Sequence, residues 1–342
     1  MTIKICTIGC GGHSSDVHGP AQKKYAQLYP DAVLAACCDL NAAHAEEYRQ
    51  RFGFARCYGD VEEMLAKEQP DAVFIIVPTA ATLQVACPIL RRGIPVMLEK
   101  PPGLTSAELE ALIAAASEGG APHQVGFNRR KMPLMRQAME TLERTMPPEA
   151  VFQIDYEMIR CDRRDEDFST TAVHSIDAAR FLARSPFKSA VLRYRAFKEL
   201  GPTVTGVEAE VKCASGTRIV LNIQPVAGLN HERIALYAHK KTVAIEFPVM
   251  RADGPGFSLD YWENGKLLSS APVQAAVDLF GFYSETEAFL EALRHGGHPN
   301  PLLSDCRQQV RLMEAIRNRE THVIWSDSPC HESPALTGSA RR

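Results

Sequence analysis

The chain contains no long hydrophobic run and no large excess of charge of either sign. Its longest strongly apolar stretch, Ala72 to Pro78, is far shorter than the roughly 20 residues of a membrane-spanning helix, and no secretory segment is expected before the first strand. Lys and Arg number 38 against 41 Asp and Glu, so a net charge of −3 offers no general attraction to nucleic acid or an anionic membrane. We therefore expect a cytoplasmic protein without nucleic-acid or membrane partners.

The ten cysteines include no C-x-x-C pair. Cys37 and Cys38 are adjacent, and Cys6 and Cys87 lie inside apolar runs, an arrangement that suits neither a disulfide framework nor a zinc site. The sequence therefore predicts reduced cysteines, as in the cytoplasm, and no bound metal.

The 342 residues favour two domains, and 45% hydrophobic with 23% charged residues is typical of a globular protein. Over residues 1–127, short β-branched runs alternate with helical patterns, which predicts an α/β Rossmann domain built on a parallel sheet. The expected strands are Ile3–Ile8, Val33–Cys38, Val73–Val77, Val96–Leu98 and Gln124–Phe127. The expected helices are Gly19–Leu28, Asn41–Arg51, Val61–Lys67, Leu83–Arg92 and Ser106–Ser117.

Over residues 128–325 the pattern changes to long segments of alternating polarity, which predicts an α+β domain with a large, mostly antiparallel open sheet. The expected strands are Val151–Met158, Ala190–Phe197, Val207–Cys213, Thr217–Gln224, Ile234–Ala238 and Val243–Phe247. The expected helices are Leu134–Met146, Phe282–Arg294 and Ser304–Arg317. Residues 326–342 are rich in Ser, Pro and Gly and are expected to be a disordered tail.

A glycine-rich turn directly follows the first expected strand. Such a turn opens a helix whose free N–H groups can hold a pyrophosphate, although it also suits an ordinary strand-to-helix connection. The candidate cofactor residues in this turn are Gly9, Gly11, Gly12, His13 and Ser14, with Ser14 in place of the third glycine of G-x-G-x-x-G.

The second expected strand is followed by Asp39. An acidic side chain there accepts hydrogen bonds from the adenosine ribose and repels a 2′-phosphate, which favours NAD over NADP. The same aspartate would also serve as the N-cap of the next helix, and a methyltransferase would place an acid here as well.

Three later segments carry polar side chains of the kind that bind or react. Glu99-Lys100-Pro101 and Gly126-Phe127-Asn128-Arg129-Arg130 each end a strand at the edge where parallel sheets bind ligands, and His174 and Asp177 share one face of a helical turn. Alone, the lysine suits a solvated strand end and the histidine suits a core position. Together with the glycine turn and the helix at Phe282–Arg294, the segments resemble the glucose-fructose oxidoreductase, inositol dehydrogenase and rhizopine catabolism family (Gfo/Idh/MocA).

The resemblance, which covers about residues 2 to 325, implies a nicotinamide cofactor and a small-molecule substrate. It places Lys100 and His174 at the reacting hydroxyl, with the peptide bond before Pro101 often cis, and it puts Pro78, Glu99 and Asn128 beside the cofactor. It also implies a homodimer or homotetramer formed through the sheet of the second domain. Oxidising an alcohol needs a base for the hydroxyl proton, a role that Lys100 and His174 can share.

The chain departs from the family pattern near the histidine. Many sugar and polyol dehydrogenases of the family carry Asp four residues before it and Gly two before it, whereas this chain has Thr170 and Ala172. A histidine that often follows strand four is also missing from Val77-Pro78-Thr79-Ala80-Ala81-Thr82. These differences count against inositol-like and common aldose substrates, and Thr170 is retained as a candidate substrate contact.

Further candidate substrate contacts lie on and after the first strand of the second domain. Tyr156 and Arg160 belong to that strand, and the polar loop after it contributes Arg163, Arg164 and Asp165. A charge cluster of this kind is also typical of a solvated loop, but an arginine-rich pocket would favour an acidic substrate.

The sequence thus predicts an NAD(P)-dependent oxidoreductase acting on a hydroxyl or carbonyl of a sugar, polyol, diol or related small molecule. Two alternatives remain open at this point. One is a regulator that keeps the fold and the nucleotide site without turnover, which the missing aspartate favours and the intact Lys100 and His174 disfavour. The other is a glycoside hydrolase that uses bound NAD for transient oxidation.

Overall fold

The computed structural model describes residues 2–247, 249, 257–272 and 278–325. Its first sheet has six parallel strands in the order β3-β2-β1-β4-β5-β6. The strands are β1 (Ile3–Ile8), β2 (Ala32–Cys38), β3 (Arg56–Tyr58), β4 (Ala72–Ile75), β5 (Val96–Glu99) and β6 (His123–Gly126). The order reverses between β1 and β4, and ligands of open parallel sheets bind at the carboxyl ends of the strands beside such a reversal.

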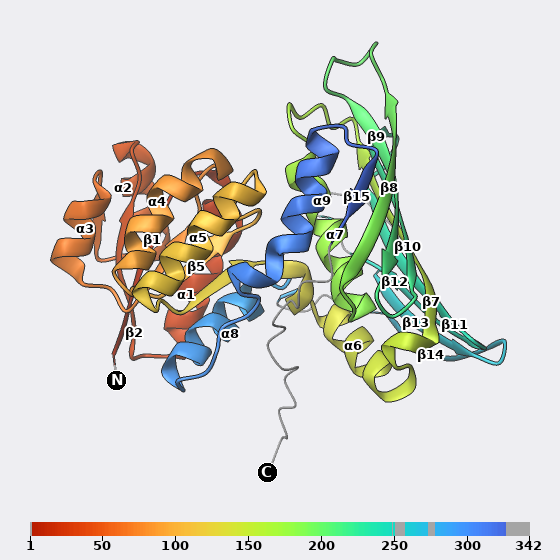
Figure 1. Cartoon of the computed structure of the whole chain (residues 1–342). Coiled ribbons are helices and arrows are strands. Elements are labelled where there is room, and N and C mark those ends of the chain that lie inside the picture. Colours follow the sequence, from red (N-terminus) through yellow and green to blue (C-terminus); the bar gives the residue numbers. More distant parts are fainter. Residues whose placement is uncertain (1, 248, 250–256, 273–277, 326–342) are drawn as a thin grey trace.

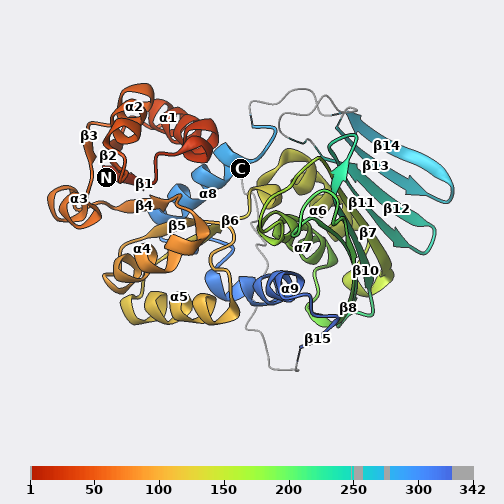
Figure 2. The ribbon, with the colours of Figure 1, turned by 90° about the horizontal axis from the view of Figure 1, so that it is seen from above.

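Helices cover both faces of this sheet, with α1 and α2 on one side and α4 and α5 on the other (Figure 2). The helices of this domain are α1 (Gly19–Leu28), α2 (Ala42–Phe52), α3 (Val61–Glu68), α4 (Thr79–Arg91) and α5 (Ser106–Gly119). A single π-helical turn, η1 (Ser14–His18), precedes α1. Three helices begin at side-chain caps, because the free N–H groups of a first turn need acceptors; the caps are Asn41, Asp60 and Thr105.

The second sheet has nine strands in the order β14-β13-β12-β11-β7-β10-β9-β8-β15. All neighbours are antiparallel except β7 and β10. The strands are β7 (Val151–Cys161), β8 (Phe187–Ala196), β9 (Thr205–Cys213), β10 (Arg218–Ala227), β11 (His231–Ala238), β12 (Lys241–Glu246), β13 (Ser258–Glu263), β14 (Lys266–Pro272) and β15 (His322–Ile324). Buried and less buried residues alternate along β7 and β10, as a sheet with one covered face requires.

Three helices cover the face of this sheet that looks toward the first domain, whereas no helix of the described chain covers the opposite face (Figure 1). They are α6 (Pro133–Thr145), α7 (Ser169–Ala183) and α9 (Arg307–Arg317). Short 3-10 turns precede or link them, namely η2 (Asn128–Lys131), η3 (Pro148–Ala150) and η4 (Leu303–Cys306). The open face exposes aromatic side chains, among them Phe152 and Trp262.

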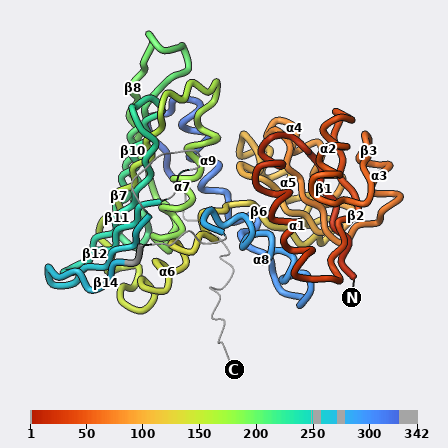
Figure 3. The backbone as a smooth tube through the Cα atoms, turned by 180° about the vertical axis from the view of Figure 1, so that it is seen from behind, coloured from red at the N-terminus to blue at the C-terminus, as the bar shows by residue number. Residues whose placement is uncertain are grey.

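Helix α8 (Phe282–Arg294) follows the second sheet in sequence but packs against α1 of the first domain (Figures 1 and 3). The hydroxyl of Tyr25 donates to Glu291 at 2.6 Å, and Arg294 forms an ion pair with Asp31 at 2.6 Å. Phe289 is fully buried in the apolar cluster on this side of the sheet. The chain therefore crosses between the domains three times, from β6 to α6, from β14 to α8 and from α8 to α9.

The fold class expected from the sequence is confirmed, and the bounds of β1, α1 and α8 match the expected ones. Helix α4 begins four residues earlier than expected, at Thr79. The sequence patterns did not reveal β3, β13, β14 and β15. Three of these are edge strands, and β13 is next to an edge. The tail expected at 326–342 lies outside the described residues.

The nine cysteines that the structure describes are all unpaired, and eight of them are not exposed. None of the helices in the described ranges combines the length and the hydropathy that a bilayer span requires.

Candidate active site

A cavity of about 620 Å³ lies where the carboxyl ends of β5 and β6 meet α7 and the end of β7. A volume of this order suits a small-molecule ligand. Its lining residues come from both domains and are His13, Glu99, Lys100, Asn128, Arg129, Met132, Arg160, Cys161, Arg163, Thr171, His174, Asn230, Val249, Phe280 and Phe282. Seven of the candidate residues from the sequence are among them, namely His13, Glu99, Lys100, Asn128, Arg160, Arg163 and His174.

Lys100 follows the last residue of β5 and enters the cavity half-buried. Burial, together with the positive charges of Arg129 and Arg163, lowers the pKa of its ammonium group, although Glu99 acts in the opposite direction. A lowered pKa makes the neutral amine easier to reach, and the neutral amine is the form that accepts a proton. The peptide bond between Lys100 and Pro101 is cis, as the family resemblance implies.

His174 reaches the same cavity from α7, in the other domain. Burial and the nearby Arg129 and Lys100 lower the pKa of its imidazole well below the usual value, so the ring is neutral at neutral pH. Its Nδ1 is buried and has no hydrogen-bond partner among the described residues. The two domains thus place one neutral nitrogen base and one perturbed amine at a single cavity.

Thr170 does not line this cavity. Its hydroxyl donates to the backbone oxygen of Asp167 at 3.0 Å and helps to close the first turn of α7. Thr171, one residue later, lines the cavity together with His174 because three positions along a helix return to the same face. Of the two threonines, Thr171 and not the expected Thr170 therefore lines the cavity.

Tyr156 and Arg160 belong to a buried charge network behind the cavity wall. Glu232, on β11, is completely buried and accepts hydrogen bonds from the Tyr156 hydroxyl and from both Arg129 and Arg160. Despite burial, the two arginines hold the pKa of the Glu232 carboxyl well below its usual range. Arg160 lines the cavity, but Tyr156 is 1% exposed and does not, so a direct substrate contact at Tyr156 is not supported.

Asp177 does not contact His174, although three residues separate them on one helix. Its carboxylate accepts from the Arg130 guanidinium at 2.9 Å and from the Gln309 amide at 3.0 Å, and it is 1% exposed. The pair therefore fixes α7 against η2 and α9 instead of forming a relay with the histidine. This buried contact holds the loop that carries Arg129 in place.

Gly9 shows why the turn after β1 requires glycine. Its φ is +95°, and a Cβ atom there would lie 2.0 Å from the carbonyl oxygen of Ile76. Its N–H donates to Cys38 at 2.8 Å, which ties the turn to the end of β2. The turn can therefore pass close to β4 only without a side chain.

Gly11 and Gly12, in contrast to Gly9, have open space where a side chain would lie. A Cβ atom at either position would find nothing within 4 Å, so no protein atom explains the missing side chains. The first N–H groups of the helix that starts here lack intrahelical acceptors and point outward, which is the arrangement that holds a pyrophosphate. These residues fit a dinucleotide, whereas the Ser14 hydroxyl is buried and donates to Tyr48 at 3.1 Å.

The π-helical turn η1 brings His13 and His18 to one side of the helix. Residues five apart on an α-helix lie about 140° apart around the axis, but here the two ring centroids are 5.5 Å apart. Glu99 accepts from His18 at 2.6 Å and from His13 at 3.2 Å through the same oxygen. Burial would raise the pKa of Glu99, but these two hydrogen bonds keep it well below the usual value, so Glu99 is ionised.

The same three side chains have the spacing of a metal site, since their ligand atoms lie within 4.8 Å of one another. Metal-bound histidines normally donate a hydrogen bond from the second ring nitrogen. The Nδ1 of His18 is instead buried without an acceptor in the described part of the chain. This arrangement fits a ring that donates to Glu99 better than it fits a metal ligand.

Asp39 is half-buried and binds the glycine turn. One carboxylate oxygen accepts from the N–H of Cys10 at 2.7 Å, and the other accepts from the N–H of Asn41 at 2.8 Å. The cap of α2 is Asn41, so the alternative role of Asp39 as the cap of that helix is wrong.

Pro78 occupies the N-cap of α4 at the carboxyl end of β4 and is exposed there, outside the cavity. Asn128 donates to Phe280 at 2.9 Å and lines the cavity.

The sequence reading missed Arg129, Asn230 and Glu232 as site residues. Arg129 stood inside a recognised segment, but its pairing with Glu232 joins positions 103 residues apart. In the sequence, Glu232 is a charged residue beside the alternating pattern of an expected strand. A charged residue at such a position also suits the exposed face of a sheet, so the pattern did not indicate a buried site. Of the polar loop, Arg163 lines the cavity, and Arg164 and Asp165 do not.

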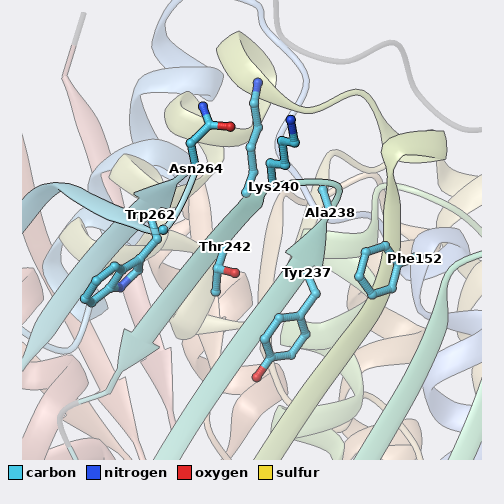
Figure 4. Close-up of a pocket in the computed structure, with 9 residues that line it drawn as sticks. Phe152, Tyr237, Ala238, Lys240, Thr242, Trp262 and Asn264 are labelled. Carbon is cyan, nitrogen blue, oxygen red and sulfur yellow. The ribbon is translucent and has the colours of Figure 1, made fainter.

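A larger hollow, of about 740 Å³, lies on the uncovered face of the nine-stranded sheet (Figure 4). Aromatic and threonine side chains from neighbouring strands line it, including Phe152, Tyr237, Thr242 and Trp262. It contains no pair of titratable groups with shifted pKa values among its lining residues, so the inter-domain cavity is the better candidate for catalysis.

Residues 3–127 match the family model GFO_IDH_MocA, described as an oxidoreductase family with an NAD-binding Rossmann fold. D-Apiose dehydrogenase from Paraburkholderia graminis is 26% identical over 99% of this chain and 93% of its own length. Inositol 2-dehydrogenase from Rhizobium meliloti is 25% identical over 92% of this chain and 96% of its own length.

Among solved structures, levoglucosan dehydrogenase in complex with NADH and L-sorbose superposes with a TM-score of 0.80 at 18% identity. The match covers 95% of this chain and 99% of that protein. This likeness establishes that both domains, and not the Rossmann domain alone, share one fold. With the family motifs in their expected order and the family model on residues 3–127, the first domain is that of the Gfo/Idh/MocA family of NAD-binding oxidoreductases.

Proposed function

We propose that this oxidoreductase oxidises a secondary hydroxyl of a sugar, polyol or related small molecule in the cavity between its domains. The observation that carries the proposal is the meeting of Lys100 and His174, from different domains, at one cavity. The relatives include dehydrogenases of apiose, inositol and levoglucosan, and these names support the substrate class.

The two residues have separate roles in the proposal. A bound nicotinamide supplies the acceptor for the hydride that leaves the carbon. His174 is neutral and can accept a hydrogen bond from the reacting hydroxyl, while Lys100 takes up the proton as the carbonyl forms. The ion pair of Arg130 with Asp177 and the buried Glu232 network act as positioning groups for this pair.

The test is the Lys100→Met variant, assayed by steady-state reduction of NAD with a substrate that the wild type oxidises. Removing a general base lowers the rate by about 10²- to 10⁴-fold, and we expect kcat/KM to fall within that range. The wild-type rate of oxidation should fall as the pH is lowered through the depressed pKa of Lys100, because the ammonium form cannot accept a proton. The variant should lose this part of the pH profile.

The matched control is Lys67→Met, because Lys67 is exposed on α3 and paired with Glu63, away from the cavity. It should retain the wild-type rate and pH profile. Full turnover by Lys100→Met would overturn the assignment. Turnover by the wild type also separates this enzyme from a nucleotide-binding regulator of the same fold.

NAD is the proposed cofactor in preference to NADP. Asp39 stands at the end of β2 with its carboxylate directed to the glycine turn, where it would face the adenosine ribose. Its negative charge would repel a 2′-phosphate. The absence of an alternative role as a helix cap supports this assignment.

A homodimer or homotetramer formed through the second sheet is part of the proposal, as is a cytoplasmic location. Phe152 is 57% exposed and Trp262 is 40% exposed on the uncovered face (Figure 4). Leu267 and Leu268 of β14 are also exposed. Clustered exposed apolar side chains of this kind favour a protein interface.

A further inference from the structure

We infer that the substrate of this enzyme carries a carboxylate, as a sugar acid does. The inference rests on the proposed function, because it concerns the molecule that occupies the same cavity. It goes beyond that function in naming a carboxylate on the substrate, whereas apiose, inositol and levoglucosan, the substrates named for three of the relatives, carry none.

The charge of the cavity wall favours an anion. Among the described lining residues, three side chains are guanidiniums, and the only carboxylate is Glu99. The three guanidiniums are those of Arg129, Arg160 and Arg163. A bound oxidised nicotinamide would bring a further positive charge to this site. The cavity therefore attracts an anion.

The two carboxylates near the cavity, those of Glu232 and Glu99, already accept hydrogen bonds from other groups of the protein. Glu232 is shared between two guanidiniums, so the buried set of Arg129, Arg160 and Glu232 keeps one net positive charge. Glu99 accepts from two histidines and from the backbone N–H of Lys100 at 3.0 Å. Uncompensated buried charge is costly, and a substrate carboxylate would offset it.

The side chains of the cavity wall also offer more hydrogen-bond donors than acceptors. Arg129 uses Nε and one terminal nitrogen for Glu232, so its other terminal nitrogen is not used for that carboxylate. The Asn230 oxygen accepts from the N–H of Cys161 at 3.0 Å, so the NH₂ group of Asn230 is left to donate. Hydroxyl groups of a neutral polyol need acceptors as well as donors. The described side chains of the wall offer donors in excess, which is the complement of a carboxylate.

Arg163 is the side chain best placed to meet that carboxylate. Its N–H donates to Pro225 at 2.8 Å, which fixes the backbone, and its guanidinium is 44% exposed at the cavity wall. Asp165 takes Nε and one terminal nitrogen, so the other terminal nitrogen remains available. The next residue, Arg164, is also half-exposed and paired with an aspartate, but it does not line the cavity. The two arginines form a matched pair for an experiment.

The experiment compares two six-carbon polyols that differ in one terminal group, D-gluconate with a carboxylate and D-glucitol with a hydroxymethyl group. Their dissociation constants are measured by calorimetry on the full chain saturated with NADH, so that no turnover is needed. We expect gluconate to bind at least about 10-fold more tightly, since a charge-assisted hydrogen bond contributes about 1.5–3 kcal/mol.

The variants then test the residue. Arg163→Gln should weaken gluconate binding about 10-fold and leave glucitol binding unchanged, whereas Arg164→Gln should change neither. Glucitol binding as tightly as gluconate, or no measurable binding of either, would overturn the inference. NAD reduction with neutral sugars by the same preparation would then show that the proposed function stands without it.

Discussion

At the scale of single residues, the glycine turn and the cofactor preference both depend on Asp39. Its carboxylate holds the N–H groups of Cys10 and Asn41 and would face the ribose of the cofactor. We expect the wild type to bind NADH more tightly than NADPH. Asp39→Ser should weaken NADH binding by about 10-fold and narrow the difference, because it removes both an acceptor and the charge that repels a 2′-phosphate.

Side-by-side fluorescence titrations with NADH and NADPH measure these affinities. Asp71→Asn is the control, since Asp71 binds the backbone of Lys4 at the amino end of the same sheet, away from the cofactor edge. Equal wild-type affinity for the two nucleotides, unchanged in Asp39→Ser, would contradict the role assigned to Asp39.

At the scale of elements, the turn between β1 and η1 separates a glycine needed for folding from glycines that make room for a ligand. Gly9→Ala would force a methyl group against the Ile76 carbonyl at a positive φ, and it should lower the free energy of unfolding by at least about 2 kcal/mol. Gly12→Ala meets no protein atom within 4 Å and should leave stability within about 0.5 kcal/mol of the wild type.

Gly12→Ala, which should leave stability almost unchanged, should weaken cofactor binding. The Gly12→Ala methyl group would fill the space that a pyrophosphate needs, and we expect NADH affinity to fall at least about 10-fold. Urea unfolding and NADH titration on both variants give the two readouts. Normal NADH binding by Gly12→Ala would show that the cofactor does not approach this part of the turn.

At the scale of the whole molecule, the uncovered face of the second sheet sets the expected assembly. Phe152→Glu combined with Trp262→Glu places two charges in the apolar surface and should convert an oligomer into monomers, as measured by light scattering after size exclusion. Leu40→Glu is the control, because Leu40 is equally apolar and 97% exposed but lies on the first domain. A wild-type monomer would show that no such interface forms. An oligomer that the double substitution leaves intact would show that the interface lies elsewhere.

Local patterns were sufficient for most elements of the first domain. The strand Ile3–Ile8 and the helix Gly19–Leu28 were predicted at their observed bounds, because parallel strands read as continuous apolar runs and α1 follows a glycine turn. Strand β3 was missed, since three residues at a sheet edge carry little periodicity. The π-turn was missed because its effect, the meeting of His13 and His18, appears only once the helix is built.

The sequence by itself determined the fold class, the family and the turn that suits a dinucleotide, because these depend on the periodicity of apolar residues and on short motifs. The tertiary structure decided which polar groups meet. It brought Lys100 and His174 to one cavity, moved the substrate-facing threonine from Thr170 to Thr171, and placed Tyr156 behind the wall in contact with Glu232. These outcomes depend on helix rotation and on pairing between distant strands, which no local pattern encodes.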